Sequence, residues 1–138
     1  MTITESSNPS NFLEADVRNA LIHMLVENLG FPRAWLAVEK ELKEFADARA
    51  PRRRIDLLAY GMVGNTLIPL LLIECKRETV DAAAEQVIGY NAFVRAPFVA
   101  LACAGEMRWG YCDMQSGTYL WHSGIPSYQT LLQTLKVG

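Results

Sequence analysis

In the first third of the chain, leucine or valine recurs at every fourth position. These residues are Leu13, Val17, Leu21 and Leu25. A period close to four places them along one face of an α-helix. Ser10 or Asn11 can cap the start of this helix, and Gly30 followed by Pro32 ends it. The pattern therefore predicts one amphipathic helix, preceded by a flexible tail over residues 1–9.

The middle of the chain has the shorter patterns of β-strands. Strands are predicted over 36–45, 55–60 and 67–76. Residues 46–53 form a loop and 61–65 a turn. The last of these strands is apolar almost throughout until it reaches Glu74, which indicates burial on both faces.

The second half continues with both types of element. Thr79 can cap a helix over 79–95, and Pro97 ends it. A strand over 98–103 follows, then a hairpin over 108–113 and 118–122, and then a short helix over 127–136. This order predicts a single mixed α/β domain over residues 10–138.

Composition adds a constraint on function. The chain has 138 residues, of which 51% are hydrophobic, so it can bury the core of one domain. Its net charge of −2 lacks the basic surplus that is typical of nucleic-acid binders. A site rich in carboxylates, which a metal ion later neutralises, is compatible with that charge.

Neither a secreted protein nor a membrane protein is indicated. The three cysteines have no paired spacing, so neither a disulfide framework nor a zinc site is predicted. The first ten residues are polar, and the longest apolar stretch, 67–73, is too short to span a bilayer. We expect a cytoplasmic protein that does not enter a membrane.

Three charged residues near the buried strand indicate chemistry. Alternation places Glu74 and Lys76 on one strand face, about 7 Å apart. If the strands pair antiparallel, Asp56 can approach Glu74. Two adjacent carboxylates repel each other unless a cation lies between them, and their hard oxygens suit Mg²⁺ or Mn²⁺. The backbone carbonyl of Cys75 could also face that metal.

On its own, a Glu-x-Lys pair is more often a solvated strand edge with a modest ion pair. Two further features favour a phosphodiester substrate. A basic cluster, Arg52, Arg53 and Arg54, directly precedes the aspartate. Gln86 and Tyr90 share one face of the following helix. Their alternative interpretations are a solubilising surface and a helix packed on a sheet.

Together these segments resemble a known family. The segments are Arg54-Ile55-Asp56, Leu72-Ile73-Glu74-Cys75-Lys76 and Gln86-x-x-x-Tyr90, with flanking Gly30-Phe31-Pro32, Val38-Glu39-Lys40 and Gly89-Tyr90-Asn91. The composite resembles the PD-(D/E)xK nuclease superfamily. Within it, the composite is similar to the nuclease domain at the N terminus of type I restriction enzyme R subunits. The resemblance covers roughly residues 10–130.

The resemblance implies a restriction-endonuclease-like fold, with a central mixed sheet of about four strands flanked by helices and a C-terminal hairpin. It implies that Asp56 and Glu74 are metal ligands and that Lys76 is the catalytic lysine. Glu14 would match an additional acidic residue near the metal. Gln86 would match the glutamine of a QxxxY motif that helps to position DNA or the active site. Ile55 departs from the family pattern, because it stands where a proline is named.

Two functions from different classes remain. The first is a Mg²⁺-dependent DNA endonuclease of a restriction system, with other restriction subunits as partners. Cutting both strands of a duplex would take two active sites, so a homodimer is an open alternative. The second is a non-catalytic module of the same fold that binds nucleic acid or protein alongside a partner.

Overall fold

The structure of the protein is a computed structural model, which describes residues 9–46, 50–76, 80–103 and 105–137. Three α-helices, two 3-10 helices and six strands make up this part of the chain. In chain order they are α1 Pro9–Glu27, η1 Arg33–Trp35, β1 Leu36–Val38, η2 Leu42–Glu44, β2 Leu57–Val63, β3 Thr66–Cys75, α2 Val80–Val94, β4 Phe98–Cys103, β5 Glu106–Cys112, β6 Tyr119–Ser123 and α3 Tyr128–Val137.

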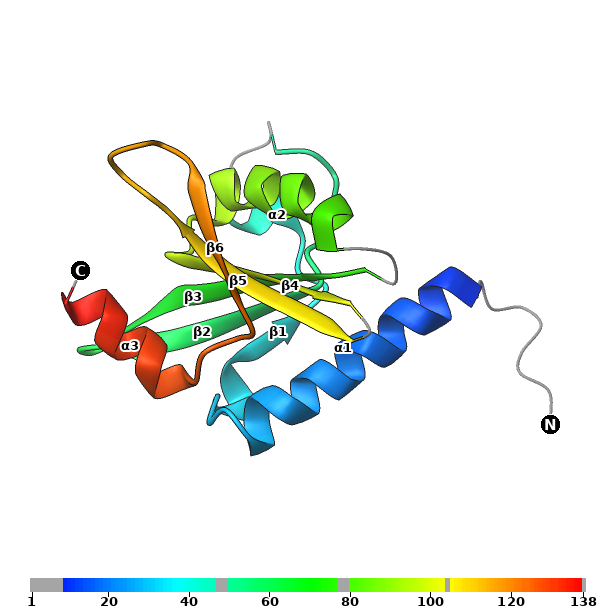
Figure 1. Cartoon of the computed structure of the whole chain (residues 1–138), viewed down its shortest axis with the longest axis horizontal. Coiled ribbons are helices and arrows are strands. Elements are labelled where there is room, and N and C mark those ends of the chain that lie inside the picture. The colour runs from blue at the N-terminus through cyan, green and yellow to red at the C-terminus, as the bar shows by residue number, and fades with distance from the viewer. Residues whose placement is uncertain (1–8, 47–49, 77–79, 104, 138) are drawn as a thin grey trace.

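All six strands form one sheet, in the order of the sequence from β1 to β6 (Figure 1). Neighbouring strands are antiparallel except β3 and β4, which are parallel. A parallel pair needs a long crossover connection, and α2 supplies it. The fold is therefore a mixed α+β sheet, in agreement with the predicted class.

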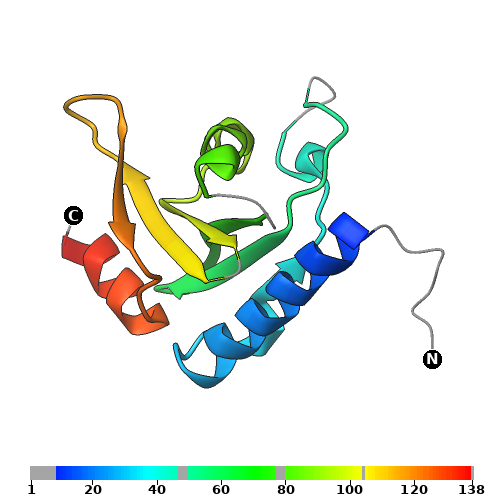
Figure 2. The ribbon, with the colours of Figure 1, turned by 45° about the vertical axis from the view of Figure 1, so that its right-hand side comes forward.

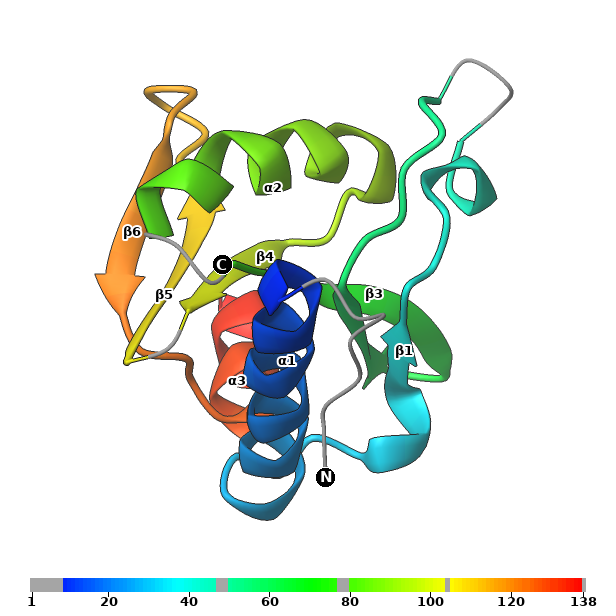
Figure 3. The same ribbon diagram turned by 90° about the vertical axis from the view of Figure 1, so that its right-hand side faces the viewer.

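Helices cover both faces of this sheet (Figures 1, 2 and 3). One apolar cluster joins the sheet to Leu21 and Leu25 of α1 and to Leu131 of α3. The other joins the opposite face to Ala83 and Val87 of α2. Both sides of β3 are thus covered, as its apolar run predicts. No helix in the described residues is long and apolar enough to cross a membrane.

The expected number of about four strands is wrong. The predicted C-terminal hairpin is present as β5 and β6, and it continues the sheet beyond β4. The short strand β1 extends the other edge beside β2. Edge pairing satisfies backbone groups that would otherwise be exposed, which is why both segments join the sheet.

The predicted strand over 36–45 is also wrong beyond its first residues. β1 ends at Val38, and Glu39 has a left-handed backbone with φ 54°. The 3-10 helix η2 follows, with Glu41 and Glu44 forming a capping box. Because these two glutamates satisfy each other's backbone N–H groups, the charged segment turns instead of extending.

The predicted turn over 61–65 is shorter in the structure. β2 continues to Val63, and only Gly64 and Asn65 separate it from β3. Gly64 has φ 61°, which a two-residue hairpin turn requires. At the other end, β2 begins at Leu57, so Ile55 and Asp56 precede the strand rather than lie within it.

Gly110 is a position where the sheet leaves no room for a side chain. A Cβ there would lie 2.5 Å from the Leu120 carbonyl oxygen and 2.8 Å from the Trp121 ring. We expect Gly110→Ala to lower the free energy of unfolding by about 1–3 kcal/mol, measured by urea denaturation. Gly89→Ala is the control, because nothing lies within 4 Å of that helical position. It should raise stability by about 0.5–1 kcal/mol, and equal losses in both variants would contradict the prediction.

Candidate active site

Asp56 and Glu74 are brought together by the pairing of β2 with β3. The register places Leu57 opposite Ile73, so the preceding Asp56 is next to Glu74 of the paired strand β3. Side chains two residues apart on a strand share a face. Leu72 lies in the cluster under α2, and therefore the Glu74 side chain lies on the α2 face of the sheet.

Hydrogen bonds hold Asp56 from three directions. Its N–H donates to Glu74 Oε2 at 3.0 Å, and its Oδ2 accepts from the N–H of Cys75 at 2.8 Å. Its carbonyl accepts from the N–H of Glu39 at 3.2 Å. Both peptide groups and the side chain of this residue are thus fixed, although it lies outside the regular strand.

Glu74 is a buried acid with an unusual protonation equilibrium. The residue is only 1% exposed. Burial first, and then the charge of Asp56, raise the pKa of Glu74 to about 9, against an opposing hydrogen bond from the Asp56 N–H and the charge of Lys76. At neutral pH the pair therefore holds a proton, which a divalent cation could replace.

The donor set fits Mg²⁺ or Mn²⁺. Such ions are commonly held by one or two carboxylates together with water, and Asp56 and Glu74 supply two. Within the described residues, no group of three or more His, Cys, Asp or Glu side chains could hold a metal ion. Glu14 lies in α1, but its side chain is outside the described part. Cys75 contributes its N–H to the Asp56 contact.

Lys76 directly follows β3, beside the carboxylates. Its N–H donates to the carbonyl of Ala102 at 2.9 Å, which continues the pairing of β3 with β4 past the last strand residue. The ammonium group is close enough to Glu74 to oppose the rise in that residue's pKa. Asp56, Glu74 and Lys76 therefore form one cluster, the carboxylate–lysine cluster.

Gln86 and Tyr90 belong to α2, which covers the sheet face that carries Glu74, and they are hydrogen-bonded to each other. Gln86 Nε2 donates to Tyr90 Oη at 2.6 Å, one turn along α2. Tyr90 is buried in the apolar cluster beneath that helix, whereas Gln86 is half-buried. Among the hydrogen bonds of the described residues, none joins Gln86 to the carboxylates.

The three consecutive arginines are exposed beside the cluster. Arg54 forms an isolated antiparallel bridge with Glu41, and its Nη1 lies 3.9 Å from Glu39 Oε1. Arg53 Nη1 donates to the carbonyl of Arg52 at 3.1 Å. The sequence pattern places Glu39 in a strand and in the Val38-Glu39-Lys40 segment of the family resemblance, but it does not indicate a role for this residue at the site. Only its left-handed backbone and its bond to Asp56 show its place at the site.

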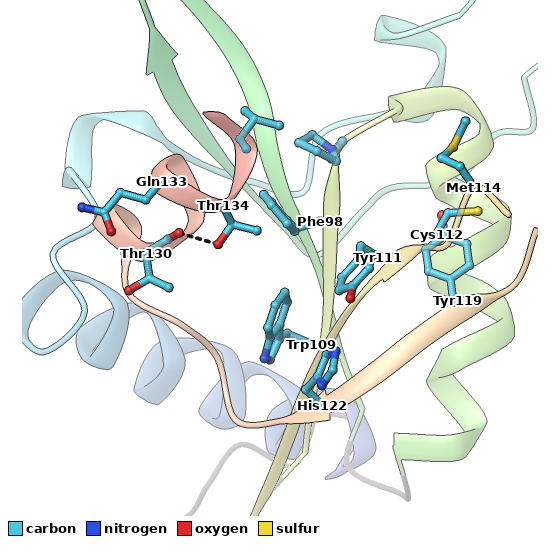
Figure 4. Close-up of a pocket in the computed structure, with 13 residues that line it drawn as sticks. Phe98, Trp109, Tyr111, Cys112, Met114, Tyr119, His122, Thr130, Gln133 and Thr134 are labelled. Atoms are coloured by element: carbon cyan, nitrogen blue, oxygen red, sulfur yellow. Dashed lines mark hydrogen bonds between the residues drawn. The ribbon is translucent and has the colours of Figure 1, made fainter. Parts of the chain in front are cut away.

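A separate cavity of about 970 Å³ lies between α3 and the β5–β6 hairpin (Figure 4). Phe98, Trp109, Tyr111 and His122 line one side, and Thr130 and Thr134 of α3 line the other. Neither Asp56 nor Glu74 lines it. The aromatic rings pack against one another, edge-on in Phe98–Trp109, tilted in Trp109–His122 and stacked in Tyr111–His122. The cavity is therefore distinct from the carboxylate–lysine cluster.

Comparison with known proteins places this geometry in a family. The family model described as the type I restriction enzyme R protein N terminus matches residues 13–126 of this sequence. A solved fragment of a protein assigned as an HsdR subunit of a type I restriction enzyme, from Vibrio vulnificus YJ016, is 18% identical with a TM-score of 0.58. That match covers 96% of this chain but only 26% of the other.

No curated protein matches the chain. The likeness in structure supports the fold, and the family model extends over most of the sequence, including all three residues of the carboxylate–lysine cluster. The chain therefore belongs to the family of type I restriction enzyme R protein N-terminal regions.

Proposed function

We propose that this domain is a Mg²⁺-dependent DNA endonuclease of the PD-(D/E)xK type, acting in a restriction system. The observation that carries the proposal is the carboxylate–lysine cluster. A buried glutamate beside a second carboxylate is costly in a folded protein unless a proton or a cation compensates it. The R-protein family membership supplies the restriction context.

The residues of the cluster divide the chemistry between them. Asp56 and Glu74 would hold the metal, which supplies Lewis-acid polarisation of a phosphate oxygen and a more acidic water. Lys76 would orient or deprotonate the attacking water, or stabilise negative charge as it grows on the phosphate. The Cys75 N–H keeps the Asp56 carboxylate in place for this task.

Groups around the cluster would bind DNA. The exposed arginines Arg52, Arg53 and Arg54 would contact backbone phosphates. Gln86, whose amide nitrogen donates to Tyr90, would position a DNA group or the metal site through its amide oxygen. Other subunits of the restriction system are the proposed protein partners.

A cleavage assay tests the proposal. Supercoiled plasmid and single-stranded DNA are incubated with the protein and Mg²⁺ or Mn²⁺, beside a Glu74→Ala variant that is purified in parallel. We expect metal-dependent nicking or cutting by the wild type and loss of it in the variant, because one of two ligands is gone. Equal cutting by both proteins, or none by either, would contradict the proposal.

A second candidate is a non-catalytic module of the same fold. The net charge of −2 favours it, because an acidic protein is poorly suited to bind DNA alone. Divalent metal binding distinguishes the two. A bare scaffold gains nothing from holding Mn²⁺ between Asp56 and Glu74, so calorimetric titration with Mn²⁺ should show a site only if the nuclease proposal holds.

A further inference from the structure

A row of residues crosses the sheet at the level of the candidate site. Glu74 of β3 is paired with Leu101 of β4, and Leu101 is paired with Arg108 of β5. Directly paired residues of neighbouring strands point to the same face. Leu101 lies in the apolar cluster under α2, so Arg108 lies on the same face as Glu74.

The register also sets the distance along this row. Neighbouring strands are about 4.8 Å apart, so the backbone of Arg108 is about 10 Å from that of Glu74. Successive phosphates of one strand of a DNA duplex are separated by about 3.4 Å along the helix axis. A DNA strand with one phosphate at the carboxylates would therefore bring another within reach of the Arg108 guanidinium.

The Arg108 side chain forms exposed ion pairs with two carboxylates. Its Nη2 and Nε donate to Glu106 Oε2 at 2.9 and 3.1 Å, and its Nη1 lies 3.4 Å from Asp81 Oδ1. The Arg108 side chain is 40% exposed and that of Asp81 84%. Ion pairs exposed to this degree contribute little to stability, so exchange of a carboxylate for another anion costs little.

We propose that Arg108 is a phosphate-binding residue for the DNA backbone, and that Glu106 and Asp81 occupy its guanidinium until DNA displaces them. This inference rests on the proposed function, because the position of the DNA is set by the carboxylate–lysine cluster. A guanidinium presents its N–H groups as a planar fork that matches phosphate oxygens. Arg108 would thus extend the basic surface to the β5 side of the site, opposite Arg54.

The test measures binding to a fluorescently labelled DNA duplex by anisotropy, without divalent metal and over a range of NaCl concentrations. Arg108→Gln should make the slope of log affinity against log salt less steep by about 0.9, the value for one phosphate contact. This slope corresponds to roughly eightfold weaker binding at 0.1 M salt. Arg108→Lys keeps the charge and should retain the slope. Arg33→Gln is the control, because Arg33 lies before β1, at the end of that strand away from Glu39. It should change neither the slope nor the affinity.

Removal of the competing carboxylate should have the opposite effect. We expect Glu106→Gln to bind the duplex roughly two- to fivefold more tightly, the range that a weak ion pair implies. Glu85→Gln removes the same charge from an exposed position of α2 and controls for net charge. The inference is overturned if Arg108→Gln has the same salt slope as Arg33→Gln. It is also overturned if Arg108→Gln changes the unfolding midpoint but not DNA binding.

The outcomes separate this inference from the proposed function. An Arg108-dependent slope without metal-dependent cutting supports the phosphate site and contradicts the nuclease. Cutting with an unchanged slope supports the nuclease and contradicts the phosphate site. If the wild type does not bind the duplex at any salt concentration, the Arg108 proposal is wrong.

Discussion

Replacement of Lys76 by alanine is expected to lower the rate of DNA cleavage at least about a hundredfold while Mg²⁺ binding persists. A positioned proton-transfer or charge-stabilising group is typically worth this factor or more. The carboxylates of Asp56 and Glu74 are held by backbone and burial, not by the lysine, and so they still bind the cation. Single-turnover cleavage and Mn²⁺ calorimetry measure the two effects separately.

Asp56→Ala supplies the contrast. It removes a ligand and the partner of the Cys75 N–H, so both metal binding and cleavage should be lost. A contaminating nuclease would cut the DNA equally in all three preparations. Equal rates for the wild type, Lys76→Ala and Asp56→Ala would therefore show that the cleavage does not come from this cluster.

The second large effect concerns the stability of the metal-free protein at different pH values. Burial and the Asp56 charge raise the pKa of Glu74 from 4.5 to about 9, so between these values the folded state keeps a proton that the unfolded chain releases. The stability that Glu74 contributes is therefore fully present below pH 4.5 and is lost as the pH rises toward 9. Between pH 5 and 8 we expect a loss of about 4 kcal/mol from this group.

Glu74→Gln should remove this dependence, because the amide does not titrate in the range. Urea unfolding in EDTA at pH 5, 6, 7 and 8 measures the change, with Glu85→Gln as the exposed control. Excess Mg²⁺ should restore stability to the wild type at pH 8 but not to Glu74→Gln, since ligands stabilise the state that binds them. If wild type and Glu74→Gln lose the same free energy with pH, burial does not raise the pKa of Glu74 as described.

The core of the site could be predicted because it depends on short-range rules. Strand alternation puts Glu74 and Lys76 on one face, and a tight turn after β2 makes antiparallel pairing with β3 the simplest arrangement. The approach of Asp56 to Glu74 follows from those two facts. The position of Asp56 ahead of the strand does not, because it depends on the backbone of Glu39, which no local pattern indicates.

The sequence by itself determined the helices, the buried strand and the charged residues at its end, since these follow from the periodicity of apolar positions and from turn residues. Only the tertiary structure decided the order of six strands and the row that joins Glu74 to Arg108. The physical reason is that strand pairing is a contact between distant segments. Arg108 is aligned with Glu74 because both of their strands pair with β4. The residues next to Arg108 in the sequence do not indicate that register.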